Sequence, residues 1–166
     1  KIKNTDFISH LRNIKEIDLS HNEITTIDLN DELHLIHSLN ISHNNISSLN
    51  FIPKIKTINV LNISANPIKD YSPLKHLENL DELYLEDLLL EEFEVFDNFE
   101  FLEVLQLRNN KLKEIKNIEN LLSIHTLDIS HNQFNQIEKI QELQELIYLD
   151  ISSNKINDVS CLKNLK

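Results

Sequence analysis

The chain has 166 residues, of which 40% are apolar, and its formal net charge at pH 7 is −11. The apolar content is sufficient for a packed core. The negative charge argues against nucleic acid or an anionic membrane surface as a partner, since their phosphates would repel the protein. It permits a protein partner with a basic patch, although acidity also serves simply to keep a long surface soluble.

The content of two residue types, glycine and cysteine, limits the class of protein that this chain can be. Glycine is absent, and phosphate-binding loops, dinucleotide-binding fingerprints and nucleophile elbows all need glycine. We therefore expect neither an enzyme nor a cofactor. The single cysteine, Cys161, cannot form a disulfide within the chain, so the sequence does not demand an oxidising compartment. At its position we expect a half-buried, inert thiol.

The sequence favours a cytoplasmic location. No apolar run approaches the roughly 18 residues of a membrane span, and no signal peptide is visible. Glycosylation at Asn40 and Asn62, which lie in acceptor sequences, would cover the predicted binding face. A secreted or cell-surface location is the alternative, and a viral protein would act in the host cytoplasm. Abundant Ile, Asn and Lys indicate an AT-rich genome.

A period of 22 residues runs along the chain from its first residues. Residues 1–13 form a partial unit, with Ile2, Ile8 and Leu11 at apolar positions and Thr5 in place of an apolar residue. Seven full units follow, each anchored on one position: Asn22, Asn44, Asn66, Leu88, Asn110, Asn132 and Asn154. The equal steps without an insertion predict a single domain over residues 1–166.

The first half of each unit is predicted to contain a strand. In the first unit Ile14, Ile17 and Leu19 precede Asn22 and Ile24 follows it, and this L-x-x-L-x-L-x-x-N-x-L pattern recurs along the chain. Alternate side chains of the strand point inward, and strands of neighbouring units stack about 4.8 Å apart into a parallel sheet. The stacked anchors are expected to form an asparagine ladder that satisfies backbone groups leaving the sheet.

The second half of each unit has apolar residues at every third position, as in Leu112, Ile115, Ile118 and Leu121. This spacing suits a 3₁₀ turn or a short helix. We therefore expect an α/β solenoid: an arc with a concave parallel sheet and a convex side of 3₁₀ turns or short helices.

The pattern resembles a known family. The segment NPIKDYSPLKHLENL (residues 66–80) looks like the 22-residue class of leucine-rich repeat, and NDVSCLKNL (residues 157–165) resembles it again. That class is typified by bacterial internalins and by the repeat-type regulatory subunit of protein phosphatase 1. The resemblance covers residues 1–166 and rests on core residues. It implies a concave face that binds another protein.

The fourth unit departs from the pattern. Leu88 replaces the anchor asparagine and cannot satisfy backbone polar groups, so we predict an altered turn or a water molecule there. Behind it Phe93, Phe96 and Phe99, with Phe101 nearby, are expected to fill the core and fix the curvature.

The outward positions of the strands are mostly small and polar, but apolar and aromatic residues surrounded by charges gather near the middle. This arrangement matches the anatomy of a protein-binding hot spot, whereas isolated apolar surface residues would need no explanation. We predict a partner-binding site centred on Tyr84 and formed by Val60, Glu82, Tyr84, Glu86, Val104, Gln106, Arg108, Asp128 and Tyr148.

Ser-His-Asn triplets occur at residues 20–22, 42–44 and 130–132. Nucleophilic catalysis is not expected, because adjacent residues of a strand point to opposite sides. His21 and His43 would be neighbours in the stack, but two ligands make a poor metal site. We therefore expect no metal and interpret the triplets as turn-forming polar residues.

The predicted function is a non-catalytic module that binds a protein partner on its concave sheet. It would act as an adaptor, a regulatory subunit or a viral competitor of a host interaction. The most specific of these hypotheses is a regulatory subunit of a phosphatase. The alternatives are a secreted, internalin-like adhesin and a scaffold that self-associates through its ends, neither of which carries a clear polar cap.

Overall fold

The computed structural model describes residues 1–29 and 35–165, and the chain divides into two compact units, Lys1–Leu80 and Asp81–Lys166. The 22-residue period of the sequence continues without an insertion across this boundary. That the whole chain forms one domain stays a prediction.

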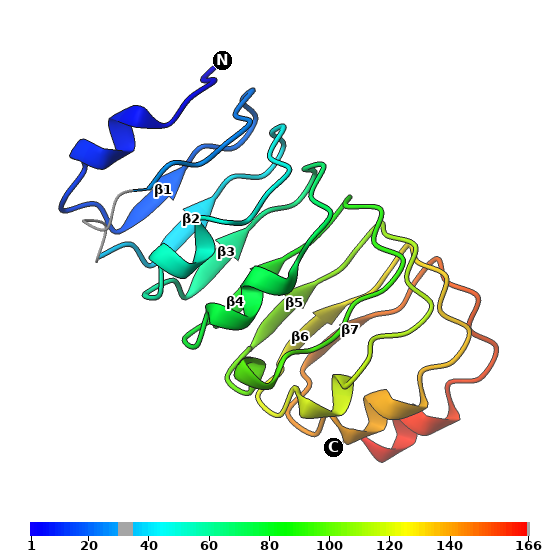
Figure 1. The fold of residues 1–166 in the computed structure, drawn as a ribbon. Coiled ribbons are helices and arrows are strands. Elements are labelled where there is room, and N and C mark those ends of the chain that lie inside the picture. Colours follow the sequence, from blue (N-terminus) through cyan, green and yellow to red (C-terminus); the bar gives the residue numbers. More distant parts are fainter. Residues whose placement is uncertain (30–34, 166) are drawn as a thin grey trace. The chain divides into compact units, whose positions relative to one another are not determined.

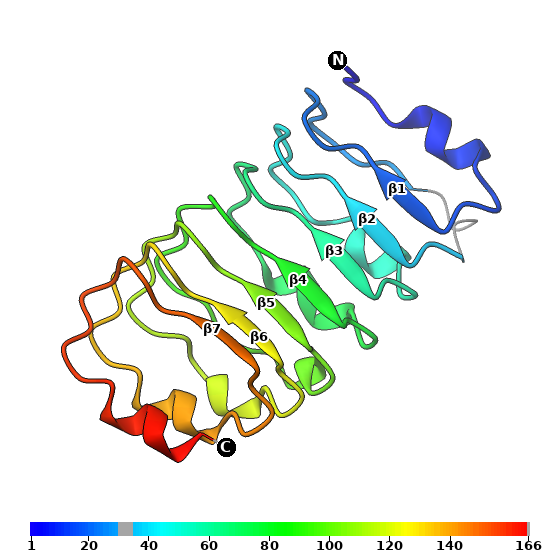
Figure 2. The ribbon, with the colours of Figure 1, turned by 180° about the vertical axis from the view of Figure 1, so that it is seen from behind.

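The first unit contains three short parallel strands in chain order, which lie side by side in Figure 2. Ile17 pairs with Leu39, and Leu39 pairs with Leu61, so equivalent residues of successive repeats stand opposite each other. The elements are η1 (Asp6–His10), β1 (Glu16–Asp18), β2 (Ser38–Asn40), η2 (Ile52–Lys54), β3 (Val60–Asn62) and η3 (Ser72–His76), where η denotes a 3₁₀ helix.

The second unit repeats this arrangement with four parallel strands, coloured from green to orange in Figure 1. Leu83, Leu105, Leu127 and Leu149 are paired in that order along the sheet. The elements are β4 (Glu82–Tyr84), η4 (Asp97–Phe99), β5 (Val104–Gln106), η5 (Ile118–Asn120), β6 (Thr126–Asp128), η6 (Glu138–Glu142), β7 (Tyr148–Asp150) and η7 (Ser160–Asn164).

The core of each unit lies between its strands and its 3₁₀ helices. In β1 to β5 the middle residue of the strand is buried while its two neighbours are more exposed, as Leu61 and Leu83 illustrate. In β6 Asp128 is buried as well, and in β7 the middle residue, Leu149, is half-buried. Burying one such aliphatic side chain stabilises the fold by about 1.5–3 kcal/mol. The predicted fold class, an α/β solenoid with a parallel sheet and 3₁₀ turns, is confirmed within each unit.

The phenylalanines of the fourth repeat divide between core and surface. Phe93 and Phe99 are buried, as predicted. Phe96 is half-buried and packs edge-on against Phe99, with ring centroids 5.5 Å apart. Phe101 is exposed, so it does not contribute to the core.

The predicted asparagine ladder is present within each unit. The Asn44 side-chain amide donates to the carbonyl oxygens of Leu19 and Ile41, at 2.9 and 3.1 Å, and its Oδ1 accepts the Ile24 N–H at 2.9 Å. Asn44 therefore completes the turn of the preceding repeat as well as its own. The same pattern is made by Asn66, Asn110, Asn132 and Asn154.

The first residues complete the ladder at the start of the chain. The Ile2 N–H donates to Asn22 Oδ1 at 2.8 Å, as the equivalent N–H does in later repeats. Ile8 is buried, and the buried Thr5 accepts the Asp28 N–H on its hydroxyl oxygen. These contacts are the ones expected of the end of a repeat, and the assignment of residues 1–13 as a partial repeat stays a prediction.

The turn before every anchor contains a left-handed residue with φ between 51° and 56°, as at His21, His43 and His131. This conformation explains the Ser-His-Asn triplets as turn residues. The fourth repeat differs, because Leu89 is left-handed as well as Asp87. Asn110 Oδ1 accepts both the Leu88 and Leu90 N–H groups, at 3.1 and 3.0 Å. The altered turn predicted at Leu88 is confirmed.

We expect Asn132→Ala to lower the free energy of unfolding by about 1–3 kcal/mol, because it leaves the Leu112 N–H without its acceptor. The Leu107 carbonyl oxygen keeps one of its two donors, the side-chain amide of Asn110. Urea unfolding followed by circular dichroism measures the change. Asn135→Ala, an exposed residue of the same repeat, is the control. A similar small loss in both variants would contradict the ladder's role.

Leu89→Gly should raise the free energy of unfolding by about 1 kcal/mol, because glycine adopts the left-handed conformation without the Cβ penalty. Leu89 is 67% exposed, so little packing is lost. The matched control is Leu122→Gly: Leu122 is 66% exposed but has no positive φ, and glycine should destabilise there. Thermal unfolding of both variants checks the opposite signs.

Candidate partner-binding surface

The outward side chains of β4 to β7 and of the residues just after them form one surface of the second unit. The register places Glu82 opposite Val104 and Tyr84 opposite Gln106, and adjacent strands of a sheet are about 4.8 Å apart. We call the following residues the strand surface: Glu82, Tyr84, Glu86, Val104, Gln106, Arg108, Thr126, Asp128, Tyr148 and Asp150.

Eight of the nine residues predicted for the binding site lie on the strand surface. The ninth, Val60, is a half-buried residue of β3 in the first unit, where it pairs with Ser38. It is therefore not counted in the strand surface.

Tyr84 is held in place by its neighbour on the same strand. Its hydroxyl donates to Glu82 Oε2 at 2.7 Å. Burial raises the pKa of the Tyr84 phenol to about 12, and the hydrogen bond and charge of Glu82 and the charge of Glu86 add to this. Tyr84 is thus a neutral, oriented ring beside two carboxylates.

The charges of the strand surface are mainly negative. Four carboxylates, those of Glu82, Glu86, Asp128 and Asp150, accompany one guanidinium, that of Arg108. The pKa of Asp150 is lowered, chiefly by hydrogen bonds from Ser152 and further by the charge of Arg108. The surface is therefore suited to a partner with positive charge.

One residue predicted for the site is buried, and one exposed residue near it was not predicted. Asp128 is only 7% exposed, and its Oδ1 accepts the Ser130 N–H at 2.8 Å, so it supports the turn and offers a partner little surface. Ile147, which was not predicted for the site, is largely exposed beside the exposed Tyr148. A sequence signal exists, because this repeat position is polar in the other repeats of the unit, as at Glu103.

Two of the histidines and the single cysteine lie outside the strand surface. His21 and His43 are stacked neighbours, with ring centroids 4.2 Å apart. Among residues 1–29 and 35–165, no group of three or more His, Cys, Asp or Glu side chains could hold a metal ion. Cys161 is half-buried, with Sγ 3.6 Å from the Ile137 carbonyl oxygen. Within the described part of the chain, no helix is long and apolar enough to cross a membrane.

Comparison with family models agrees with the repeat geometry. Residues 101–145 match a model of two copies of Leucine Rich repeats, and residues 10–29 and 143–163 match a second Leucine Rich repeat model. The protein is therefore a leucine-rich repeat protein. None of the curated protein sequences matches it.

Solved structures extend this relationship to internalins. Internalin C2 of Listeria monocytogenes strain 4b F2365 is 28% identical, with a TM-score of 0.83 over 99% of this chain and 73% of that one. A leucine-rich repeat protein of Leptospira interrogans is 25% identical, with a TM-score of 0.80 over 99% of this chain and 44% of that one. The sequence-based resemblance to internalins is confirmed.

A third structure shares the fold alone. Internalin F of the same Listeria strain is 23% identical, with a TM-score of 0.73 over 93% of this chain and 52% of that one. This chain thus spans about three quarters of internalin C2 and about half or less of the other two proteins.

We expect Glu82→Gln to lower the pKa of the Tyr84 phenol, because the carboxylate that accepts its hydrogen bond and repels the phenolate is lost. Ultraviolet titration in a Tyr71→Phe background measures it, since burial also raises the pKa of Tyr71 to about 12. An unchanged Tyr84 pKa would contradict the hydrogen bond.

The same shift makes stability depend on pH at the alkaline end. The folded-state pKa of Tyr84 lies above the usual value of 10.0, so the neutral phenol contributes fully to the free energy of unfolding below that pH. The contribution is lost as the pH rises toward about 12. In the Glu82→Gln variant, this loss of stability at alkaline pH should be smaller.

Proposed function

We propose that the strand surface of the second unit binds a protein partner and catalyses no reaction. The carrying observation is Tyr84, an aromatic ring fixed by a 2.7 Å hydrogen bond to Glu82 on a rigid sheet. Rigid aromatic residues dominate binding energy at protein interfaces because little side-chain entropy is lost when they are covered. Leucine-rich repeats typically serve as non-enzymatic interaction scaffolds, and the internalin-like fold supports the same role.

The partner we propose carries a basic patch. Glu82 and Glu86 lie on either side of Tyr84 along one edge of the surface, and Tyr148 lies on the strand at the other edge. A lysine or arginine of the partner would be attracted by the carboxylates and would cover the Tyr84 ring. Arg108 supplies the one positive charge of the surface and would pair with an acidic residue of the partner.

The cellular role proposed is that of an adaptor, a regulatory subunit such as that of a phosphatase, or a viral competitor of a host interaction, acting in the cytoplasm. The likeness to internalin C2 is the observation that favours the alternative, a secreted adhesin. Fractionation of the source cell separates the two: cytoplasmic protein excludes the adhesin, and secreted protein excludes the adaptor.

We expect Tyr84→Ala to lose the partner that wild-type protein captures from lysate of the source or host cell, because removing a buried hot-spot ring costs about 2 kcal/mol or more of binding free energy. Quantitative affinity purification measures the loss. The control is Phe101→Ala, which removes an exposed ring outside the strand surface and should leave capture unchanged.

The charge of the partner is tested in the same assay. If the partner is basic, Glu82→Lys should weaken capture, and added salt should weaken capture by the wild-type protein because it screens exposed charges. Retention of the partner by Tyr84→Ala would exclude the strand surface as its site. Capture that is independent of salt would exclude a basic patch.

A further inference from the structure

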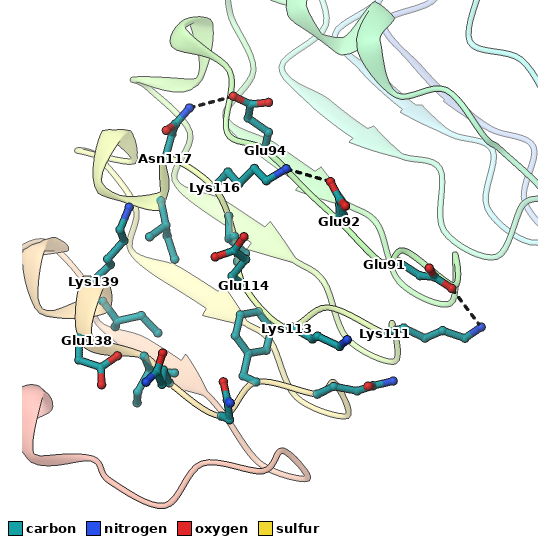
Figure 3. A pocket seen from close by; sticks show the side chains of 18 residues that line it. Glu91, Glu92, Glu94, Lys111, Lys113, Glu114, Lys116, Asn117, Glu138 and Lys139 are labelled. Atoms are coloured by element: carbon teal, nitrogen blue, oxygen red, sulfur yellow. Dashed lines mark hydrogen bonds and ion pairs between the residues drawn. The ribbon is translucent and has the colours of Figure 1, made fainter.

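A groove of about 900 Å³ lies in the second unit, between the segments that follow the anchors of the fifth and sixth repeats. Figure 3 shows Lys113, Glu114 and Lys116 along one wall, with Glu138 and Lys139 on the other. None of the residues of the strand surface lines it. Its volume is within the range of about 300–1,000 Å³ that is usual for ligand pockets.

The groove exists because its two walls have different backbone conformations. The wall of the fifth repeat is extended and forms a parallel bridge between Lys116 and Glu94 of the fourth repeat. The opposite wall enters the 3₁₀ helix η6 at Glu138. Chains of unlike conformation cannot pair with each other, so the walls separate.

Bonds between the walls occur only at the two ends of the groove, among the described residues. At one end the Gln133 N–H donates to the Leu112 carbonyl oxygen at 2.8 Å. At the other, Lys139 Nζ contacts Glu119 Oε1 at 2.9 Å. Between these points no backbone hydrogen bond joins residues 113–118 to residues 134–138 in the described part of the chain.

The extended wall presents a free backbone edge to the groove. The Lys116 N–H donates to Phe93 O at 3.0 Å, and its carbonyl oxygen accepts the Val95 N–H at 2.9 Å. Successive residues of an extended chain direct these groups to opposite sides, so those of Ile115 face the groove. Within the described residues the Ile115 backbone has no hydrogen-bond partner, although the residue is only 5% exposed.

The Ile115 N–H and C=O that face the groove favour a ligand that can supply both a donor and an acceptor. A peptide backbone does so at a strand edge. Water is the alternative occupant.

The floor and rim narrow the chemistry of the ligand. Ile118, Phe134 and Ile137 line the groove with apolar side chains. Three of the four lysines that line the groove have carboxylate partners. Lys116 pairs with Glu92 at 2.9 Å and Lys111 with Glu91 at 3.9 Å, as Figure 3 shows, and Lys139 pairs with Glu119 at 2.9 Å. These exposed pairs leave little net charge to select a charged ligand, whereas the floor suits an aliphatic or aromatic side chain.

We propose that this groove binds an extended peptide segment of another protein, which adds a strand to the edge at Ile115 and places one apolar side chain on the floor. The site is independent of the strand surface. The groove would recognise the backbone and an apolar side chain of its ligand, whereas the strand surface would recognise positive charge on its partner.

The test uses a displayed library of random linear peptides. Peptides that bind the Asn135→Trp variant are first removed, and the remaining peptides are selected for binding to the full wild-type chain. Asn135 is exposed and lines the groove, so the indole should fill it. Surviving peptides should bind Asn135→Trp at least about tenfold more weakly than wild type. The matched control is Asn157→Trp, the same residue type at the same repeat position outside the groove, which should bind like wild type.

A second measurement is made on wild-type protein, so it does not depend on the folding of a variant. In wild-type protein with a selected peptide bound, hydrogen exchange of the Ile115 amide, followed by nuclear magnetic resonance, should slow by about tenfold or more. Tyr84→Ala should bind these peptides unchanged. No surviving peptide would mean that the groove holds water only. Binding that leaves Ile115 exchange unchanged would equally overturn the proposal.

Discussion

The structure depends on one hydrogen-bonding constraint, namely that backbone groups leaving the sheet at the end of each strand must find partners inside the protein. In every full repeat but the fourth, which has Leu88, a single asparagine meets it, because an amide offers both donors and an acceptor. Asn44 and Asn132 each bond to carbonyl groups of two repeats and accept an N–H of the preceding one. The spacing of the asparagines thus sets the spacing of the strands. The strand surface and the groove are both carried on that frame.

Much of the frame could be predicted from sequence because its physics is local and repeated. Ile17 and Leu61 belong to an alternation that only a strand with one buried face satisfies. Even the exception was predictable: Leu88 lacks the groups that the anchor needs, and the turn around it changes accordingly. The outward residues Tyr84 and Val104 followed from the same alternation.

Features that depend on neighbouring repeats were harder to predict from the sequence. The burial of Asp128 is invisible in a pattern that counts its position as outward. The hydrogen bond between Tyr84 and Glu82 depends on side-chain conformation. The groove arises because Lys116 is in an extended segment while Glu138, its equivalent one repeat later, begins a 3₁₀ helix. Both repeats fit one apolar pattern, which constrains the buried side chains and not the backbone between them.

The direction of the ladder bonds also bears on how such a chain changes length during evolution. Within each unit, a repeat receives the acceptor for its turn from the asparagine of the repeat that follows, as Ile24 does from Asn44 and Leu112 from Asn132. Duplication or loss of a whole 22-residue repeat that carries the asparagine would leave its neighbours within the unit with the same bonds. An insertion of any other length would place a different residue opposite an unsatisfied N–H. Recombination between units is therefore tolerated where slippage by a few codons is not.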